Sequence, residues 1–167
     1  MQDNSHLNTD DWPEIRKLKV SNKIGWMYFA ELAKSVMDDL GDERGAELIE
    51  SWAAKVAVEK IVPAMKDMGM DGKDFMEVGA YFQMATNAIG YKTELNRKDN
   101  GDVSFKLHRD CIWFPGNEKE IRPALCQALC NCERTVATTL NSDVEVELVQ
   151  NIAKGDDVCE LIFSSKG

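Results

Sequence analysis

The pattern of residues 91–107, YKTELNRKDNGDVSFKL, decides the fold class of this chain. Apolar and polar side chains alternate on both sides of a turn that contains Asn100-Gly101, a dipeptide typical of tight hairpin turns. Alternation with a period of two indicates strands that bury one face. The sequence therefore predicts a β-hairpin in the middle of the chain.

The residues before this hairpin follow helical spacing instead. We expect helices over residues 24–40, 42–61 and 75–89, with stop signals at Gly41, Pro63 (an end or a kink) and Gly90. The apolar stripe of the first consists of Ile24, Tyr28, Leu32, Val36 and Leu40. Residues 1–20 are polar and aperiodic, so we expect them to form a loosely ordered lead-in.

A further helix and a second hairpin are expected after residue 108. Asn117 followed by Glu120 is a helix start signal, and helical spacing then continues to about Leu140. Residues 144–148 alternate, residues 154–157 form a turn, and residues 158–163 form a last strand. The expected fold is α+β, with N-terminal helices packed on an antiparallel sheet and one helix between two β-hairpins. It forms a single domain over residues 21–167.

Composition excludes several classes of partner. The chain has 167 residues and a net charge of −9, which opposes binding to nucleic acid or to an anionic membrane. No segment approaches the roughly 20 apolar residues that span a bilayer. The N-terminus lacks the pattern of a signal peptide, so we expect a cytoplasmic protein.

The predicted helix over residues 117–140 carries thiols on two sides. Cys126 and Cys130 lie with Glu133, away from the apolar stripe Leu125, Leu129, Cys132 and Val136. Cysteine is seldom exposed, so a pocket or a second packing layer is expected over Cys126 and Cys130. An equally weighted alternative is that both cysteines only fill space and have no chemical role.

Three cysteines on separate elements could also converge. Cys111 follows the first hairpin, Cys130 is on the helix and Cys159 is on the last strand. Five cysteines without an export signal favour free thiols or ligands over a disulfide framework. No cofactor is predicted; the alternative is zinc held by Cys111, Cys130 and Cys159, which would usually need a fourth ligand.

Other candidate residues are less specific. His108 is the only plausible imidazole base, although a lone strand histidine is more often structural. Trp113 and Phe114 occupy a short connection, where loops often build ligand walls, or they plug the edge of the core. Asp156 and Asp157 are most simply turn residues.

With these residues identified, the chain resembles the L-2-amino-thiazoline-4-carboxylic acid hydrolase-like family from about Leu40 to Phe163. That family is distantly similar to 4-vinyl reductase ligand-binding domains. The most specific match is residues 153–163, AKGDDVCELIF, which resemble the family's small-x-Gly-Asp-Asp-x-Cys-acidic-hydrophobic ending. Cys130 and Glu133 match a cysteine and a nearby acid, and Cys111 matches a cysteine after the hairpin.

The sequence also departs from the family pattern. Ile112-Trp113 replace a usual Pro-Phe, Ser142 stands where proline is common, and Cys126 and Cys132 are extra. Zinc-binding 4-vinyl reductase relatives carry Glu-x-x-Cys where this chain has Leu148 and Asn151. That departure counts against zinc.

The resemblance implies a pocket between helices and sheet, and hydrolysis of a carbon–nitrogen or carbon–sulfur bond in a small cyclic amidine acid. We therefore expect a hydrolase-like protein acting on a small cyclic or aromatic carboxylate. The expected catalytic residues are Cys130 or Cys159 as nucleophile and Cys111, with Glu133, His108 or Asp157 positioning protons or water. The expected substrate-binding residues are Phe82, Trp113, Phe114 and Cys126.

Two alternatives stay open: a non-catalytic small-molecule-binding module, and an accessory subunit of a catabolic enzyme. The sequence is also compatible with a homodimer.

Overall fold

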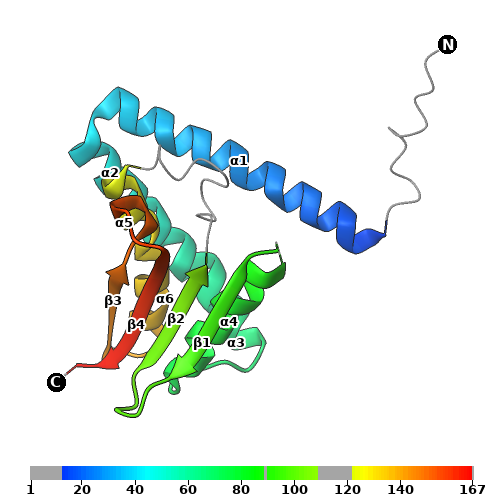
Figure 1. Cartoon of the computed structure of the whole chain (residues 1–167), viewed down its shortest axis with the longest axis vertical. Helices are drawn as coiled ribbons and strands as arrows, with labels where there is room; N and C mark the ends of the chain where they lie inside the picture. Colours follow the sequence, from blue (N-terminus) through cyan, green and yellow to red (C-terminus); the bar gives the residue numbers. More distant parts are fainter. Residues whose placement is uncertain (1–12, 89, 109–121, 167) are drawn as a thin grey trace.

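The structure, a computed structural model, describes residues 13–88, 90–108 and 122–166, and it has the predicted α+β fold. Figure 1 shows the arrangement of its elements. The helices are α1 (Glu14–Leu40), α2 (Asp42–Val56), the π-helix η2 (Ala57–Ile61), α3 (Val62–Asp67), α4 (Phe75–Ala88), α5 (Pro123–Leu129), α6 (Asn131–Leu140) and the 3₁₀-helix η4 (Ile152–Lys154). The strands are β1 (Lys92–Arg97), β2 (Val103–His108), β3 (Val144–Gln150) and β4 (Val158–Ser165).

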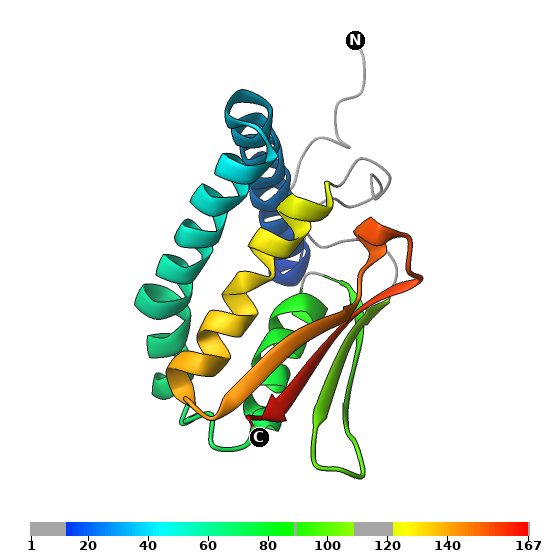
Figure 2. The same ribbon diagram turned by 90° about the vertical axis from the view of Figure 1, so that its left-hand side faces the viewer.

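Both predicted hairpins form, and they join into one antiparallel sheet. Its strand order is β1-β2-β4-β3, with Leu107 of β2 opposite Cys159 of β4. The α-helices lie on one side of this sheet (Figure 2). The core therefore forms between the sheet and α2, α4 and α6, which contribute the buried residues Ala53, Phe82 and Val136.

Helix α1 differs from expectation in its start and in its buried face. It begins at Glu14, so the predicted lead-in over residues 1–20 is too long; residues 1–12 lie outside the described part of the chain. It buries Ala30, Ala33 and Met37, whereas Ile24, Tyr28, Leu32 and Leu40 of the predicted stripe are exposed. The N-terminal half of α1 projects beyond the helices beneath it (Figure 1), and the described part of the chain leaves most of the predicted stripe exposed.

The second predicted helix continues through Pro63 instead of ending there. The π-helix η2 precedes Pro63, and Ile61 and Val62 keep helical φ and ψ values, so Pro63 lies inside a continuous helix and its missing N–H removes one helical hydrogen bond. The wider turn is how this helix accommodates its proline. It also places Ile61 in the wall of the cavity described below.

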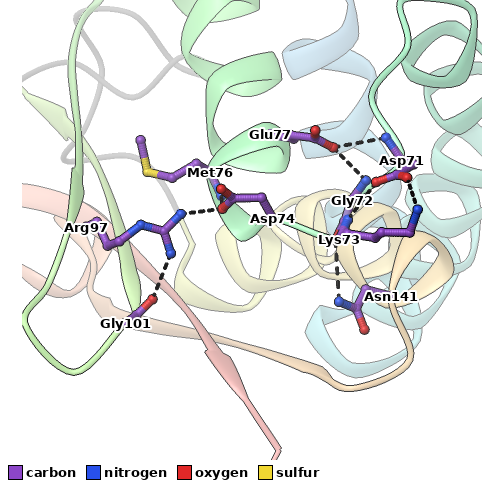
Figure 3. Close-up of polar contacts among 9 residues, drawn as sticks. All are labelled: Asp71, Gly72, Lys73, Asp74, Met76, Glu77, Arg97, Gly101 and Asn141. Atoms are coloured by element: carbon purple, nitrogen blue, oxygen red, sulfur yellow. Dashed lines mark hydrogen bonds and ion pairs between the residues drawn. The ribbon is translucent and has the colours of Figure 1, made fainter.

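The connection between α3 and α4 is fixed to two other elements (Figure 3). Glu77 accepts a hydrogen bond from the backbone N–H of Gly72 at 2.8 Å, and Asn141 donates its side-chain amide to the carbonyl of Gly72 at 3.4 Å. Asp74 forms an ion pair with Arg97 of β1. These contacts tie the start of α4 to the sheet and to the end of α6.

The cysteine-bearing helix is shorter than predicted and is divided in two. Arg122 is extended, with φ −71° and ψ 129°, so a helix from residue 117 cannot run unbroken through it. Pro123 follows Arg122, and a residue before proline avoids helical φ and ψ values. Cys130 separates α5 from α6, and residues 117–121 lie outside the described part of the chain.

Candidate functional site

A cavity of about 230 Å³ lies between the helices and the sheet. Its wall comes from α2, η2, α4, the α5–α6 segment and strands β2, β3 and β4, and most of the lining side chains are aromatic or aliphatic. Drug-sized ligands occupy roughly 300–1,000 Å³. The cavity therefore suits a smaller molecule, such as a single ring with short substituents.

Five of the predicted site residues line this cavity together. They are Phe82 from α4, Cys126, Cys130 and Glu133 from the α5–α6 segment, and Cys159 from β4. The spacing of four and then three residues along α5 and α6 places the two thiols and the carboxyl on one side. A pocket or a second packing layer is expected over Cys126 and Cys130, and both thiols lie at a cavity.

Short contacts from the segment before β4 surround two of the thiols. Cys126 Sγ donates to Asn151 Oδ1 at 3.3 Å, and the same oxygen accepts the backbone N–H of Ala153 at 2.8 Å. The backbone N–H of Ile152 donates to Cys159 Sγ at 3.5 Å. The segment containing η4 therefore orients the amide of Asn151 toward Cys126 and provides a backbone donor to Cys159.

The thiols differ in how easily they ionise. The S–H of Cys130 donates toward Cys126, which lowers the pKa of Cys126 although burial opposes this. The same contact, together with burial and the charge of Glu133, raises the pKa of Cys130 well above its ordinary value. Burial raises the pKa of Cys159 to about 11 and that of Cys132 to about 12. Of the four described thiols, Cys126 is the one whose anion the surroundings favour.

Asn151 does not contribute to the lowered pKa of Cys126. Because the N–H of Ala153 holds Oδ1, it is the amide oxygen that faces Sγ, and an acceptor stabilises the thiol rather than the thiolate. The lowered pKa of Cys126 therefore rests on the S–H of Cys130 and, to a smaller extent, on the positive charge of Lys154.

Glu133 is the only acidic side chain among the described residues of the cavity wall. Burial, together with a smaller contribution from negative charge on Cys126, raises its pKa from 4.5 to about 8, against a hydrogen bond to its own backbone. Its Oε2 atom is buried without a hydrogen-bond partner among the described residues. At neutral pH the carboxyl is mostly protonated and can donate to a ligand.

The remaining predicted site residues lie elsewhere or outside the described residues. His108 is next to Leu107, which lines the cavity, so strand alternation directs the imidazole to the opposite face. There its Nε2 lies 3.0 Å from Glu94 Oε1. Asp157 is exposed and does not line the cavity. Cys111, Trp113 and Phe114 fall within residues 109–121, which the structure does not describe.

The alternative zinc site of Cys111, Cys130 and Cys159 includes Cys111, which lies outside the described residues. The two positions that differ from zinc-binding 4-vinyl reductase relatives are described. Leu148 lines the cavity with a side chain that has no donor atom, and Asn151 Oδ1 is engaged by Cys126 and Ala153. Within the described residues, no three His, Cys, Asp or Glu side chains are arranged to hold a metal ion.

Several wall residues were not predicted from sequence. Tyr81, Ala85 and Thr86 lie near Phe82 on α4, and Trp52 lies on α2. Helical spacing predicts Trp52 and Ala85 as packing residues only, and no pattern distinguishes Tyr81 or Thr86. No local pattern indicated Asn151, because its contact with Cys126 joins segments that are distant in the chain.

Solved structures with a similar fold are only distantly related in sequence. A trafficking protein particle complex subunit 3 from Naegleria fowleri, covalently bound to palmitic acid, matches with a TM-score of 0.63 and 16% identity, over 89% of this chain and 97% of that one. An H-NOX protein from S. oneidensis in the Fe(II)NO ligation state matches with a TM-score of 0.54 and 11% identity, over 83% and 74%. At these identities the likeness concerns the fold alone.

Sequence comparison identifies the family more closely. No curated protein sequence matches this chain. The family model for L-2-amino-thiazoline-4-carboxylic acid hydrolase matches residues 21–163, which include every described residue of the cavity wall. The chain therefore belongs to the L-2-amino-thiazoline-4-carboxylic acid hydrolase family.

Proposed function

We propose that this chain hydrolyses a carbon–nitrogen bond in a small cyclic amidine acid or a similar ring compound, with the ring inside the cavity. The observation that carries this proposal is the buried carboxyl of Glu133, whose Oε2 atom has no hydrogen-bond partner among the described residues and which lies in the same cavity wall as Cys126. An amidine or amide ring offers nitrogen atoms to such a group. No lysine or arginine lines the described wall, so we place the ring, and not the carboxylate of the substrate, in the cavity.

The chemistry would use Cys126 as nucleophile, with Cys130 as the donor that stabilises its thiolate. The thiolate adds to the amidine carbon, and the carbon–nitrogen bond of the ring breaks as Glu133 gives its proton to the leaving nitrogen. Glu133, now a carboxylate, takes a proton from water that attacks the thiol-bound carbon. The carbon–sulfur bond to Cys126 then breaks, which releases the product and restores the thiolate.

This assignment differs from the expected nucleophiles, Cys130 and Cys159. Both have a raised pKa, and a thiol is a weak nucleophile compared with its thiolate. We retain Cys130 as a positioning residue for Cys126.

The test uses L-2-amino-thiazoline-4-carboxylic acid as the first substrate, followed by related cyclic amidines. Cys126→Ser and Glu133→Gln should each lower kcat by about 100-fold or more with little change in KM. Cys130→Ser should lower kcat less and move the alkaline limb of Cys126 alkylation by iodoacetamide to higher pH. Glu147→Gln, an exposed carboxyl on β3, is the matched control and should change neither constant.

Two results would contradict the assignment. Full activity of Cys126→Ser together with inactivity of Cys159→Ser would move the nucleophile to β4. Alkylation of Cys159 before Cys126 in the native protein would show that the surroundings do not favour the Cys126 thiolate.

A second candidate, a binding module for a small apolar acid, is favoured by the mostly apolar wall of the cavity. The palmitic acid reported for the trafficking-complex subunit is consistent with apolar ligands on this fold. In that case Ala85→Phe, which fills the cavity, should abolish binding of a fluorescent fatty acid, while Cys126→Ser should leave the affinity unchanged. An accessory subunit would show neither binding nor turnover alone.

A further inference from the structure

The middle of α1 presents an apolar ridge that the described chain does not cover. Val20, Ile24, Tyr28 and Leu32 follow one another at four-residue spacing and are 41%, 48%, 77% and 63% exposed. Side chains spaced by four form a continuous ridge on a helix, of the kind that packs into the groove of another helix. Exposed apolar surface of this extent marks an interaction site.

A different side of α1 contacts α2. Phe29 stacks on Trp52 with ring centroids 4.6 Å apart, and Trp52 and Leu48 on α2 are 42% and 53% exposed. At roughly 100 Å² for each half-exposed large side chain, the four ridge residues together with Met27, which is 53% exposed, offer on the order of 500 Å². This is below the ~800 Å² that each partner buries in a standard interface and is typical of a smaller one.

The charges of α1 indicate which partner fits. Residues 14–26 have a net charge of +3, from Arg16, Lys17, Lys19 and Lys23 against Glu14. Residues 28–40 have a net charge of −2, from Glu31, Asp38 and Asp39 against Lys34, although Asp38 is also paired with Arg122. Two copies of α1 that run antiparallel bring each basic half to an acidic half, and a parallel arrangement opposes like charges. The partner whose charges match α1 is therefore another α1.

We propose that α1 packs antiparallel against α1 of a second copy of this chain, across a twofold axis near Met27. With the axis there, Lys23 of one protomer lies opposite Glu31 of the partner subunit, and the ridges centred on Ile24 and Tyr28 interlock. Ridges spaced by four pack at a crossing angle of about 50°, so contacts concentrate near the axis and the helix ends diverge. The interface is isologous and closes the assembly at a dimer.

The first experiment measures the mass of the full chain in solution by sedimentation equilibrium at micromolar concentrations. We expect a dimer, and we expect Ile24→Glu and Tyr28→Glu each to raise Kd by at least about 100-fold, because the twofold axis repeats every substitution. Met84→Glu is the matched control: it lies on α4, is 46% exposed and should leave Kd unchanged. Circular dichroism verifies that each variant is folded.

Charge exchange tests the antiparallel register. Lys23→Glu and Glu31→Lys should each weaken self-association by roughly 10- to 50-fold, since two ion pairs become two repulsions. A mixture of the two variants should form a heterodimer with near-native affinity. The double variant Lys23→Glu/Glu31→Lys should also recover.

Three outcomes would overturn the proposal. A monomer at all these concentrations would do so, including one that instead sediments with anionic vesicles. A dimer unaffected by Ile24→Glu and Tyr28→Glu would use another surface. A dimer in which mixing the single charge variants restores nothing would not have the antiparallel register.

Discussion

Replacing the buried carboxyl of Glu133 with an amide should stabilise the protein while it removes the proposed activity. Folding raises the pKa of Glu133 from 4.5 to about 8, chiefly through burial. At about 1.4 kcal/mol per pH unit, this rise corresponds to a penalty of about 5 kcal/mol once the carboxyl is ionised in both states.

The pKa values of Glu133 in the unfolded and folded chains determine how stability changes with pH. Below pH 4.5 the carboxyl is protonated in folded and unfolded chains, so its ionisation costs nothing. Between pH 4.5 and about 8 only the unfolded chain loses the proton, and the free energy of unfolding falls as the pH rises. Above about 8 the penalty is constant. The folded chain is therefore most stable, with respect to this carboxyl, in acid, and this part of its stability is lost by about pH 8.

Urea unfolding of wild type and Glu133→Gln at several pH values measures this effect. We expect the variant to gain about 4 kcal/mol relative to wild type between about pH 5 and pH 8. The buried amide has its own desolvation cost, but that cost does not depend on pH. Glu147→Gln is the control, because its exposed carboxyl should not alter the pH profile. Parallel profiles for wild type and Glu133→Gln would refute the burial of a titrating carboxyl here.

Two further predictions concern packing and buried polar groups. Gly72→Ala should cost about 2–4 kcal/mol of unfolding free energy, because Gly72 has φ +72° and an added Cβ would lie 2.5 Å from Leu140 Cβ. Gly69→Ala has a similar φ of +80° but no atom within 4 Å of the added Cβ, so it should cost only about 1–2 kcal/mol by thermal unfolding. Ser104→Ala should cost about 1–3 kcal/mol in urea unfolding, since Ser104 donates to the buried Glu160 at 2.6 Å; an unchanged midpoint would contradict that role.

Local signals were sufficient for most of the fold. The first hairpin follows from alternation on both sides of Asn100-Gly101, and these signals act over a few residues. The position of Cys126, Cys130 and Glu133 on one side of the helical segment follows from helical spacing, and the cavity confirms it.

Long-range packing explains what the sequence patterns missed. Spacing showed that α1 is amphipathic, but which side faces the body depends on how far the helix extends past α2, and Ala30 and Ala33 rather than Tyr28 make that contact. The same alternation that predicted β2 separates His108 from Leu107. Alternation alone does not predict which face of the sheet the cysteine-bearing helices cover. They cover the face that contains Leu107.

The placement of Glu133 also argues that the cavity has a purpose other than stability. An isolated carboxyl in an apolar wall lowers the free energy of unfolding at neutral pH, and glutamine or leucine at that position would avoid the cost. The group also lies in the same wall as Cys126, the described thiol with a lowered pKa, and charge on Cys126 raises the pKa of Glu133. A thiolate and a protonated acid that stabilise each other in one cavity are what thiol-dependent hydrolysis requires. The destabilisation is therefore best explained as the consequence of keeping a proton next to a nucleophile.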